Sequence, residues 1–506
     1  MLSLCEYIHL SKDMKFTQIA FTLVSTLVLL CSCGDKEERP TPAKRFNIDS
    51  VVRFTHHEQN IKIEFTMEDN SATATVNNTA EWIESPTVTN GATKCIIAQI
   101  SENSGAERVA TIELSAPGYA NTKVKIKQNS APVAPANHTL MFYFFGTSLS
   151  RYFTTNINDA KLAIESGALG DNNRVIYFRQ SSKSEGYIGE LCFDKQSGKC
   201  FESILESNIE INSDIITPEY ITATINRLSS LAPAQRYGLV LAGHGTAWIA
   251  RGTAGISKAG VSHPLFVPAE GAETTRHFGE SNVQVNTSEL AEGILSSDIE
   301  LDYILFDACF MSNIETIYEL RNTANYIIAS PCEIMGRGFP YERTLPYLFK
   351  DNGTTTDYDG AAKSYHLYYR DEYTSSSRCG SIAVYDCSEV EALRDATIEV
   401  VKSATKEYNV ASLQTYEGQP NHYFYDFGEW ANVVATDSSA INTFNTQLNK
   451  TVIAKYTLDS FYTAYGSYGT RPINVQVYSG VTTSAPSETL NTHWKETEWY
   501  KSIWQL

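Results

Sequence analysis

The sequence predicts an α/β protein with a mostly parallel sheet of about six strands, preceded by a small all-β sandwich. Two hydrophobic patterns and the boundary between them support this prediction. Residues 47–130 contain short segments in which apolar and polar residues alternate, as in half-buried strands. Residues 138–506 contain near-continuous apolar runs separated by helical stretches, as in a parallel sheet covered on both faces. A linker rich in proline and alanine, residues 131–137, lies between the two patterns.

Length, charge and cysteine content limit the classes of protein that fit. The chain has 506 residues, which is more than one ordinary domain holds. Its net charge of -18 argues against nucleic acid as a partner and is compatible with a basic peptide. Its 10 cysteines show no CxxC pair and no zinc-finger spacing, and no EF-hand loop is found, so no metal ligand is assigned.

The N-terminal residues 1–33 are interpreted as a lipoprotein signal segment. Their apolar run, Ile19–Leu30, is too short to span a membrane comfortably. Cys31-Ser32-Cys33-Gly34 follows, and Leu30-Cys31-Ser32-Cys33 resembles a bacterial lipobox, with Cys33 as the lipidated residue. The charged, proline-containing residues 34–46 would form a tether. These features predict a lipid anchor in the bacterial outer membrane, on its periplasmic face or at the cell surface. The alternative is an ordinary secretory signal or a membrane anchor.

The alternating segments of residues 47–130 fit a small immunoglobulin-like sandwich. Three sets of residues in it resemble the BACON domain of gut Bacteroidetes: Asn78 with Glu81-Trp82-Ile83, then Glu102-Asn103-Ser104-Gly105, then Val124-x-Ile126-x-Gln128. The resemblance implies a spacer or adhesion module that contacts glycans or mucin. Trp82 is expected in the core rather than stacked on a ligand.

The strands of the α/β part are predicted from its apolar runs: residues 140–145, 174–178, 237–241, 303–306, 326–330 and 381–385. A hairpin is expected from Cys192 to Phe201, and a helix is expected to open at Thr217-Pro218, where proline suits the first turn. Cys192 and Cys200 bracket the turn of the hairpin and could form a disulfide in an oxidising compartment. Ligands of such sheets bind beyond the carboxyl ends of the strands.

Two motifs follow predicted strands at that edge of the sheet. His244 stands between two glycines after the strand of residues 237–241, and Cys309 follows the strand of residues 303–306. A thiol needs a base to become a good nucleophile, and histidine serves as both base and acid. If the two strands are neighbours, His244 and Cys309 would face each other. The N–H groups of Gly245 and Cys309 could then bind an oxyanion.

The residues after Cys309 also favour a nucleophile. Ser312-x-x-Glu315 matches a capping box, so a helix is expected to begin there, and a helix N-terminus stabilises a thiolate. A lone histidine in a loop is more often a surface residue, and a lone buried cysteine is more often inert. The occurrence of both at strand ends favours catalysis, and no G-x-S-x-G, H-E-x-x-H or P-loop motif competes.

Together these motifs resemble the clostripain family of cysteine peptidases, which share a caspase-like αβα sandwich. The resemblance covers residues 138–506. Its supporting segments are Arg276-x-Phe278-Gly279-Glu280, Ser288-Glu289-Leu290-Ala291, Phe306-Asp307-Ala308-Cys309-Phe310-Met311, Ala329-Ser330-Pro331-Cys332-Glu333-Ile334, Gly336-x-Gly338-Phe339-Pro340-Tyr341 and Tyr425-Asp426-Phe427. It implies endopeptidase activity after Arg or Lys through a thioester acyl-enzyme. His244 would be the general base, Cys309 the nucleophile and Gly245 the oxyanion donor.

The substrate pocket follows from the same resemblance. Asp307 matches a family acid linked to the S1 pocket, Glu333 is a second candidate, and Ser330 completes the expected substrate-binding set. A carboxylate at the base of the pocket would bind Arg or Lys through charge-assisted hydrogen bonds. The alternative for Asp307 is a strand-end residue that accepts local N–H groups. Relatives usually carry His-Gly-Ser-Gly-Trp, whereas residues 244–248 read His-Gly-Thr-Ala-Trp.

The predicted function is therefore a cell-envelope cysteine endopeptidase that acts on proteins or peptides. The alternatives are a catalytically silent surface binding or adhesion lipoprotein on the same scaffold, and a cysteine transpeptidase that uses the same pair of residues. Some relatives are processed in the insert between the two motifs, here residues 246–284, which could equally be a stable surface excursion. No cofactor is expected. Calcium dependence occurs in part of the family, but no motif for it is present here.

Overall fold

The structure is a computed structural model that describes most of the chain after residue 43. The described ranges are 44–91, 93–131, 135–211, 216–250, 273–275, 285–404, 407–419, 421–465, 472–487 and 491–505. The signal segment with Cys33, most of the tether, the middle of the Pro/Ala linker and most of the insert after His244 lie outside these ranges. Within them, no helix combines the length and the apolar character that crossing a membrane requires.

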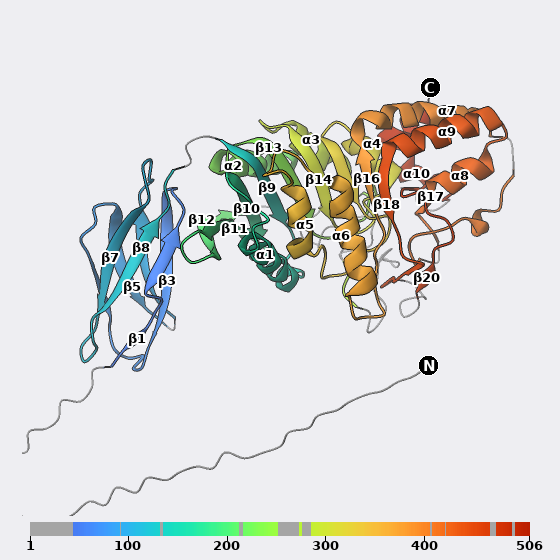
Figure 1. Ribbon diagram of the computed structural model, residues 1–506. Coiled ribbons are helices and arrows are strands. Elements are labelled where there is room, and N and C mark those ends of the chain that lie inside the picture. The colour runs from blue at the N-terminus through green and yellow to red at the C-terminus, as the bar shows by residue number, and fades with distance from the viewer. Residues whose placement is uncertain are drawn as a thin grey trace, which may run out of the picture. The chain divides into compact units, whose positions relative to one another are not determined.

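The N-terminal part of the described chain is all-β, as the alternating pattern predicts (Figure 1). One four-stranded sheet has the order β1 (Phe46–Asn47), β3 (Gln59–Met67), β6 (Lys94–Ile100) and β5 (Ile83–Asn90). The other has the order β2 (Val51–Phe54), β8 (Thr122–Gln128), β7 (Arg108–Ser115) and β4 (Thr75–Asn78). Every second residue of β3 is buried, because one face of the strand packs on the core. The ring of Trp82 packs against this core and lies 4.5 Å from the Arg108 guanidinium.

The second part contains a nine-stranded sheet rather than one of about six strands. Its order is β12 (Lys199–Glu210), β11 (Glu185–Asp194), β10 (Asn173–Gln180), β9 (Ala136–Phe144), β13 (Ala234–Ala242), β14 (Leu301–Asp307), β15 (Ala324–Ala329), β16 (Ile382–Asp386) and β18 (Val452–Tyr456). The six strands expected from the apolar runs are all present. The three additional strands, β11, β12 and β18, lie at the two edges, and their apolar runs are interrupted by charged residues such as Glu190, Glu202 and Lys455.

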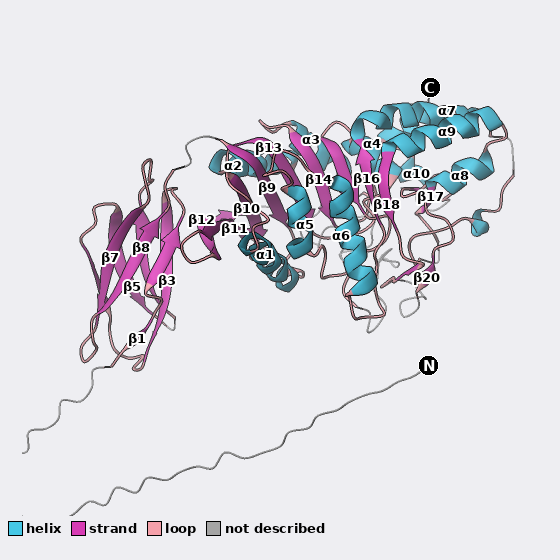
Figure 2. Ribbon diagram, viewed as in Figure 1, coloured by secondary structure: helices cyan, strands magenta, loops and turns pink. Residues whose placement is uncertain are grey.

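The central strands β10, β9, β13, β14 and β15 are parallel to one another. Each strand outside them pairs antiparallel with its inner neighbour. Helices cover both faces, and Figure 2 shows the strands flanked by them. One core contains side chains of α1 (Ser150–Glu165), α5 (Tyr341–Leu348) and α6 (Tyr358–Asp371). The other contains side chains of α2 (Pro218–Leu231), α3 (Thr287–Leu295), α4 (Ile314–Leu320), α7 (Val390–Lys402), α8 (Phe427–Val434), α9 (Ser438–Thr451) and α11 (Glu498–Trp504). The fold-class prediction is confirmed.

Small elements complete the C-terminal part. They are the pair β17 (Tyr425–Asp426) and β21 (Thr482–Thr483), the pair β19 (Ser460–Phe461) and β20 (Ile473–Asn474), and the short helix α10 (Asn491–Trp494). The pair β17–β21 lies close to the first turn of α4, because Asn313 bridges to Thr482.

The expected hairpin is formed by β11 and β12, but the disulfide suggested within it does not form. Cys192 lies opposite Phe201, and Cys200 lies opposite Phe193. Because neighbouring residues of a strand point to opposite faces, the two thiols lie on different faces of the hairpin. Both cysteines are free and buried.

Candidate active site

The loops that carry His244 and Cys309 leave neighbouring strands at the same edge of the sheet. Strands β13 and β14 pair in parallel, and their last residues, Ala242 and Asp307, lie opposite each other. The pairing continues one residue further, where the Gly243 N–H donates to the Asp307 carbonyl at 3.4 Å. His244 and Cys309 therefore each stand two residues beyond paired positions. The expectation that these two strands are neighbours is confirmed.

Gly245 brings the histidine loop into direct contact with the backbone of Cys309. A Cβ atom added at Gly245 would lie 2.4 Å from the carbonyl oxygen of Cys309 and 3.1 Å from its amide nitrogen. No side chain fits at such distances, so only glycine allows the two loops to approach this closely. The same approach brings the backbone of Gly245 beside that of Cys309, where their N–H groups were expected to act together.

His244 is buried, with 6% of its surface exposed, and it has a hydroxyl partner. Its Nε2 lies 2.8 Å from the Oγ of Ser148, which is an exposed residue in the loop after β9. The hydroxyl can donate to the ring or accept from it, so the contact holds the imidazole in place in either tautomer. Sequence reasoning missed Ser148. The pairing of β9 with β13 is the signal that could have found it, because it brings the loop after β9 to the same edge.

Cys309 is completely buried and is held by the backbone that follows β15. The Ile334 N–H donates to the Cys309 Sγ at 3.1 Å, and the Ile334 carbonyl oxygen lies 3.7 Å from the same sulfur. An N–H group directed at sulfur presents the positive end of a peptide dipole, which favours negative charge there. The backbone of Ile334 thus helps to position the sulfur atom.

The backbone is left-handed immediately after Cys309. Phe310 has a φ of 63°, which is uncommon for a bulky residue and costs energy. Its N–H donates to the Cys332 carbonyl at 3.0 Å, and its ring stacks on Phe424 with centroids 5.1 Å apart. These contacts hold the sharp turn that follows the cysteine. Ala247 is also left-handed, with a φ of 53°, and stands where the resemblance expects glycine.

The helix after Cys309 begins later than the Ser312-x-x-Glu315 pattern predicts. Asn313 is the N-cap of α4, and its side chain accepts from the Thr316 N–H. Ser312 does not cap the helix, because its hydroxyl bonds to the Tyr385 hydroxyl and to the Gly480 carbonyl. Glu315 is also used elsewhere, since its Oε1 accepts from the Ser484 N–H. Cys309 therefore lies outside the first turn of α4, and the helix contributes less to the site than expected.

Asp307 is completely buried at the end of β14. Its Oδ2 accepts from the Tyr341 hydroxyl at 2.8 Å and from the Phe339 N–H at 3.3 Å. The carboxylate thus has partners from the segment that leads into α5, in line with the alternative interpretation as a strand-end acceptor. A role in substrate binding would add to this one.

Glu333 is buried as well and joins two distant segments. Its carboxylate accepts from the Thr275 hydroxyl at 2.9 Å and from the Ala464 N–H at 2.9 Å. Burial raises the pKa of Glu333 to about 7, although hydrogen bonds from Thr463, Ala464 and Thr275 lower it. The third expected pocket residue, Ser330, is buried and bonds locally, because its hydroxyl accepts from the Cys332 N–H at 3.3 Å.

The residues 273–275 of the insert lie along the segment that holds the cysteine. Thr275 forms an antiparallel bridge with Met335, and the Gly336 N–H donates to the Thr274 carbonyl at 2.6 Å. The Glu273 N–H also donates to the Tyr462 hydroxyl at 2.8 Å. An extended piece of chain thus pairs with the backbone next to Ile334, the residue that contacts the Cys309 sulfur.

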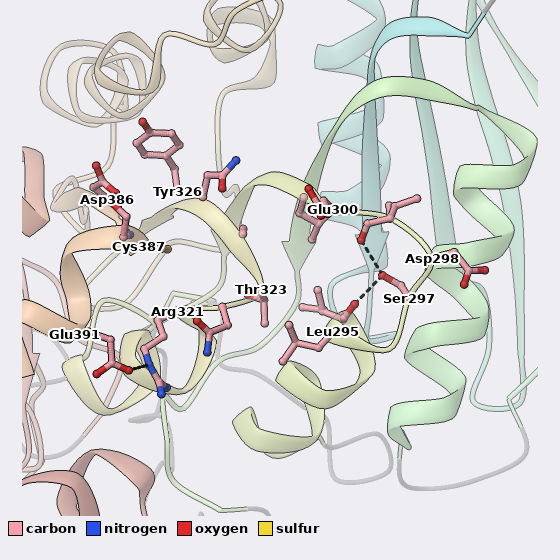
Figure 3. Close-up of a pocket in the computed structure, with 17 residues that line it drawn as sticks. Leu295, Ser297, Asp298, Glu300, Arg321, Thr323, Tyr326, Asp386, Cys387 and Glu391 are labelled. Carbon is pink, nitrogen blue, oxygen red and sulfur yellow. Dashed lines mark hydrogen bonds and ion pairs between the residues drawn. The ribbon is translucent and has the colours of Figure 1, made fainter.

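A large cavity of about 900 Å³ lies at the other end of the sheet (Figure 3). Its lining includes Leu301 and Ala324, where strands β14 and β15 begin. His244 and Cys309 lie beyond the opposite ends of the strands, so this cavity is not part of their site. Its arginine, Arg321, is paired with Glu391. Among the residues that the structure describes, no group of three or more His, Cys, Asp or Glu side chains could hold a metal ion.

An αβα sandwich with a buried cysteine and a histidine loop at the carboxyl edge of its parallel strands has the architecture of caspase-like cysteine peptidases. The sequence profile of the clostripain family, Peptidase_C11, matches residues 143–481, and the chain belongs to this family. The family resemblance seen in the sequence is confirmed. The BACON-like domain and the lipid anchor remain predictions.

Similarity to known proteins extends across the second part of the chain. The clostripain of Hathewaya histolytica is 21% identical over 244 residues, which are 42% of this chain and 44% of that protein. The chain thus matches less than half the length of that relative. A secreted C11 cysteine protease from Bacteroides thetaiotaomicron, iotapain, is 29% identical with a TM-score of 0.63, covering 73% of this chain and 99% of its own.

Two further solved structures share the fold. An inactive zymogen C11 protease from Parabacteroides distasonis is 28% identical with a TM-score of 0.60, covering 74% of this chain and 99% of its own. A secreted C11 cysteine protease from Bacteroides thetaiotaomicron, in complex with an irreversible peptide inhibitor, is 24% identical with a TM-score of 0.60, covering 73% and 99%.

Proposed function

We propose that the chain is a cell-envelope cysteine endopeptidase that cleaves peptide bonds after Arg or Lys, with His244 and Cys309 as its catalytic pair. The observation that carries the proposal is the approach of the two loops. The strands before them pair as neighbours, and Gly245 packs against the Cys309 backbone so closely that no side chain fits. Membership of a family of cysteine peptidases supports the same reaction class.

The chemistry would proceed in two steps. His244 takes the proton from the Cys309 thiol, and the thiolate attacks the carbonyl carbon of the scissile bond. The oxyanion that forms is bound by the N–H groups of Gly245 and Cys309, and the imidazolium donates its proton to the leaving amine. Water then attacks the thioester with His244 as base, which releases the acid product and restores the thiol. Ser148 would hold the imidazole during both proton transfers.

Selection of Arg or Lys would rest on Asp307, which is the last residue of the strand that leads to the nucleophile. A buried carboxylate is stabilised by a guanidinium or ammonium group that enters beside it. Tyr341 already donates to Asp307 and would fix the orientation of the carboxylate toward such a group. Glu333 is the second candidate, and its bonds to Thr275 and Ala464 favour a role in shaping the pocket wall.

Processing of the insert would open the substrate cleft. Residues 273–275 pair with the backbone next to Ile334, and an extended substrate would need that same backbone edge. Arg276 follows directly in the sequence, lies outside the described residues, and would itself be a target of a basic-specific peptidase. Cleavage after Arg276 would free the strand. An Arg276→Gln variant that stays as one band on a denaturing gel, while wild type becomes two, would support this step.

The envelope location rests on Cys33 and the segment around it, which would attach the protein to the outer membrane through lipid. Protein or peptide substrates would be met there, and the sandwich would act as a spacer that contacts glycans or mucin. Metabolic labelling with a clickable fatty acid tests this location, since a Cys33→Ala variant should lose both the label and membrane association.

A peptidyl acyloxymethyl ketone with Lys at P1 tests the catalytic proposal directly. Wild type should be labelled and should hydrolyse Arg and Lys peptides. Cys309→Ala and His244→Ala should lose labelling but keep the unfolding midpoint. Wild type that is folded and unlabelled would instead favour the silent binding protein. Labelling together with cleavage that ignores Arg and Lys would contradict the specificity, and peptide ligation products would indicate a transpeptidase.

A further inference from the structure

One strand of the insert occupies the backbone edge that an extended substrate would use. Thr275 lies opposite Met335 in an antiparallel bridge. One residue earlier, the Thr274 carbonyl accepts from the Gly336 N–H at 2.6 Å. These two contacts define the register in which an extended chain pairs with this edge, because neighbouring pairs of an antiparallel ladder follow one another without a gap.

That register relates each position of the strand to the nucleophile. The two chains run in opposite directions, so the position after Thr275 faces Ile334. The Ile334 N–H donates to the Cys309 sulfur at 3.1 Å, and the Ile334 carbonyl oxygen lies 3.7 Å from the same atom. A substrate in this register therefore places P1, the residue before the cleaved bond, opposite Ile334. Its P2 residue, one position earlier, takes the place of Thr275.

The side chain at the place of Thr275 is enclosed and hydrogen-bonded. Thr275 has 4% of its surface exposed, and its hydroxyl donates to the Glu333 carboxylate at 2.9 Å. Burial and the charges of Glu333 and Cys309 raise the pKa of Tyr465, whereas a hydrogen bond with the Thr275 side chain lowers it. The hydroxyl thus lies between Glu333 and Tyr465. Because a side chain of the insert reaches Glu333 from this edge, a substrate side chain in the same register reaches it as well.

The Thr275 hydroxyl is a donor to Glu333 that belongs to the insert. Other donors come from a distant segment: the Ala464 N–H donates to the two carboxylate oxygens at 2.9 and 3.2 Å, and the Thr463 side chain bonds to the carboxylate as well. These donors remain when the strand of the insert leaves the cleft. A completely buried carboxylate that loses a hydrogen bond is destabilised, so the open cleft favours a ligand that brings a new donor.

We propose that Glu333 is a specificity-determining residue that selects Ser or Thr at P2, by accepting a hydrogen bond from the hydroxyl of that side chain. This role rests on the proposed peptidase activity and extends it to the substrate residue next to P1. Valine has the shape of threonine but no donor, so it would cover the carboxylate without satisfying it. Glu333 then acts at P2 and leaves the P1 side chain to Asp307.

Peptides that differ only at P2 test the proposal on the whole enzyme. Each peptide carries Arg at P1, with Thr, Ser or Val at P2. The kcat/KM values for the Thr and Ser peptides should exceed that for the Val peptide at least about tenfold, because only Val lacks the hydroxyl. Equal kcat/KM values for Thr and Val would overturn this inference and leave the proposed function standing. Hydrolysis of none of the three peptides would overturn both.

Variants of Glu333 separate selection from a merely structural role. In Glu333→Gln the acceptor loses its charge, so the preference for Thr over Val should fall below about threefold. Structural damage would instead lower kcat/KM for both peptides by the same factor and leave their ratio unchanged. Glu342→Gln, at an exposed glutamate of α5, is the control and should keep the wild-type ratio. A wild-type ratio in a folded Glu333→Gln enzyme would overturn the assignment to Glu333.

The insert supplies a matched pair of variants for the same test. Thr275 is buried against Glu333, whereas Thr274 is exposed and uses its backbone carbonyl. Thr275→Val should slow the conversion of one band to two on a denaturing gel at least about tenfold, because the hydroxyl that Glu333 accepts from is removed. Thr274→Val should change this rate less than about twofold. Equal rates of conversion in the two variants would overturn the inference.

Discussion

Replacing Gly245 by alanine tests how far the site depends on the close approach of its two loops. The new Cβ would lie 2.4 Å from the Cys309 carbonyl oxygen, whereas ordinary contacts begin near 3.4 Å. The loops must therefore separate by about 1 Å, since the opposing atom belongs to the backbone and cannot rotate away. His244 moves with Gly245, and the proposed oxyanion N–H moves with it.

The size of the effect follows from that displacement. Overpacking a buried site costs about 1–3 kcal/mol of stability. A shift of about 1 Å between reacting groups costs roughly 100-fold in rate. The expected result is a folded protein with a lower unfolding midpoint and a kcat/KM for Arg or Lys peptides reduced roughly 100-fold.

The assay combines peptide hydrolysis, acyloxymethyl ketone labelling and thermal unfolding. Gly91→Ala is the matched control, because its added Cβ would meet no atom closer than 4.0 Å. That variant should match wild type in rate and within about 0.5 kcal/mol in stability. A Gly245→Ala enzyme with a rate within threefold of wild type would refute the argument that this contact sets the geometry of the site.

Three further predictions concern residues around the site. Ala247→Gly should raise the free energy of unfolding in urea by about 0.5 kcal/mol. Glycine adopts the left-handed backbone at φ 53° without strain, and this gain outweighs the extra entropy of glycine in the unfolded chain. An unchanged or lower stability would contradict the prediction. Tyr341→Phe should lower the free energy of unfolding by about 1.5–3 kcal/mol, because it removes a hydrogen-bond donor from the buried Asp307. The control Tyr347→Phe, at a partly exposed tyrosine, should change the stability little. Equal losses of stability in the two variants would show that the bond from Tyr341 to Asp307 is unimportant. The pKa of Glu333 is raised from 4.5 to about 7, so the folded state binds the proton of Glu333 more tightly than the unfolded state does. The free energy of unfolding should therefore fall by about 3 kcal/mol as pH rises from 4.5 to 7. Glu333→Gln should remove that part of the pH dependence of unfolding. Identical pH slopes of the unfolding free energy in wild type and Glu333→Gln would contradict this prediction.

Much of the site could be predicted from the sequence because parallel strands end at one edge of a sheet. The apolar runs before His244 and Cys309 mark two such strands, and short polar or small residues directly after them must lie at that edge. The six predicted strands, the two-part organisation and the family resemblance depend on local patterns of this kind. They are determined by the order of residues along a short piece of chain.

Other features depend on which strands and loops lie side by side, and the sequence does not contain that information in any local pattern. Strand order decides that Ser148 meets His244, since the pairing of β9 with β13 joins segments about a hundred residues apart. Register decides that Cys192 and Cys200 lie on opposite faces, because a shift of one residue reverses every side chain.

Competition between hydrogen-bond partners decides where helix α4 begins. The sequence by itself determined that a cysteine follows one buried strand and a histidine another. Only the tertiary structure decided that Ser312 and Glu315 do not form the expected capping box. Ser312 bonds instead to Tyr385 and Gly480, and Glu315 accepts from Ser484, all from distant segments of the chain. The helix therefore begins at Ile314, after its cap Asn313. The backbone of Ile334 donates to the Cys309 sulfur, and the lack of a side chain at Gly245 lets the histidine loop approach the Cys309 backbone.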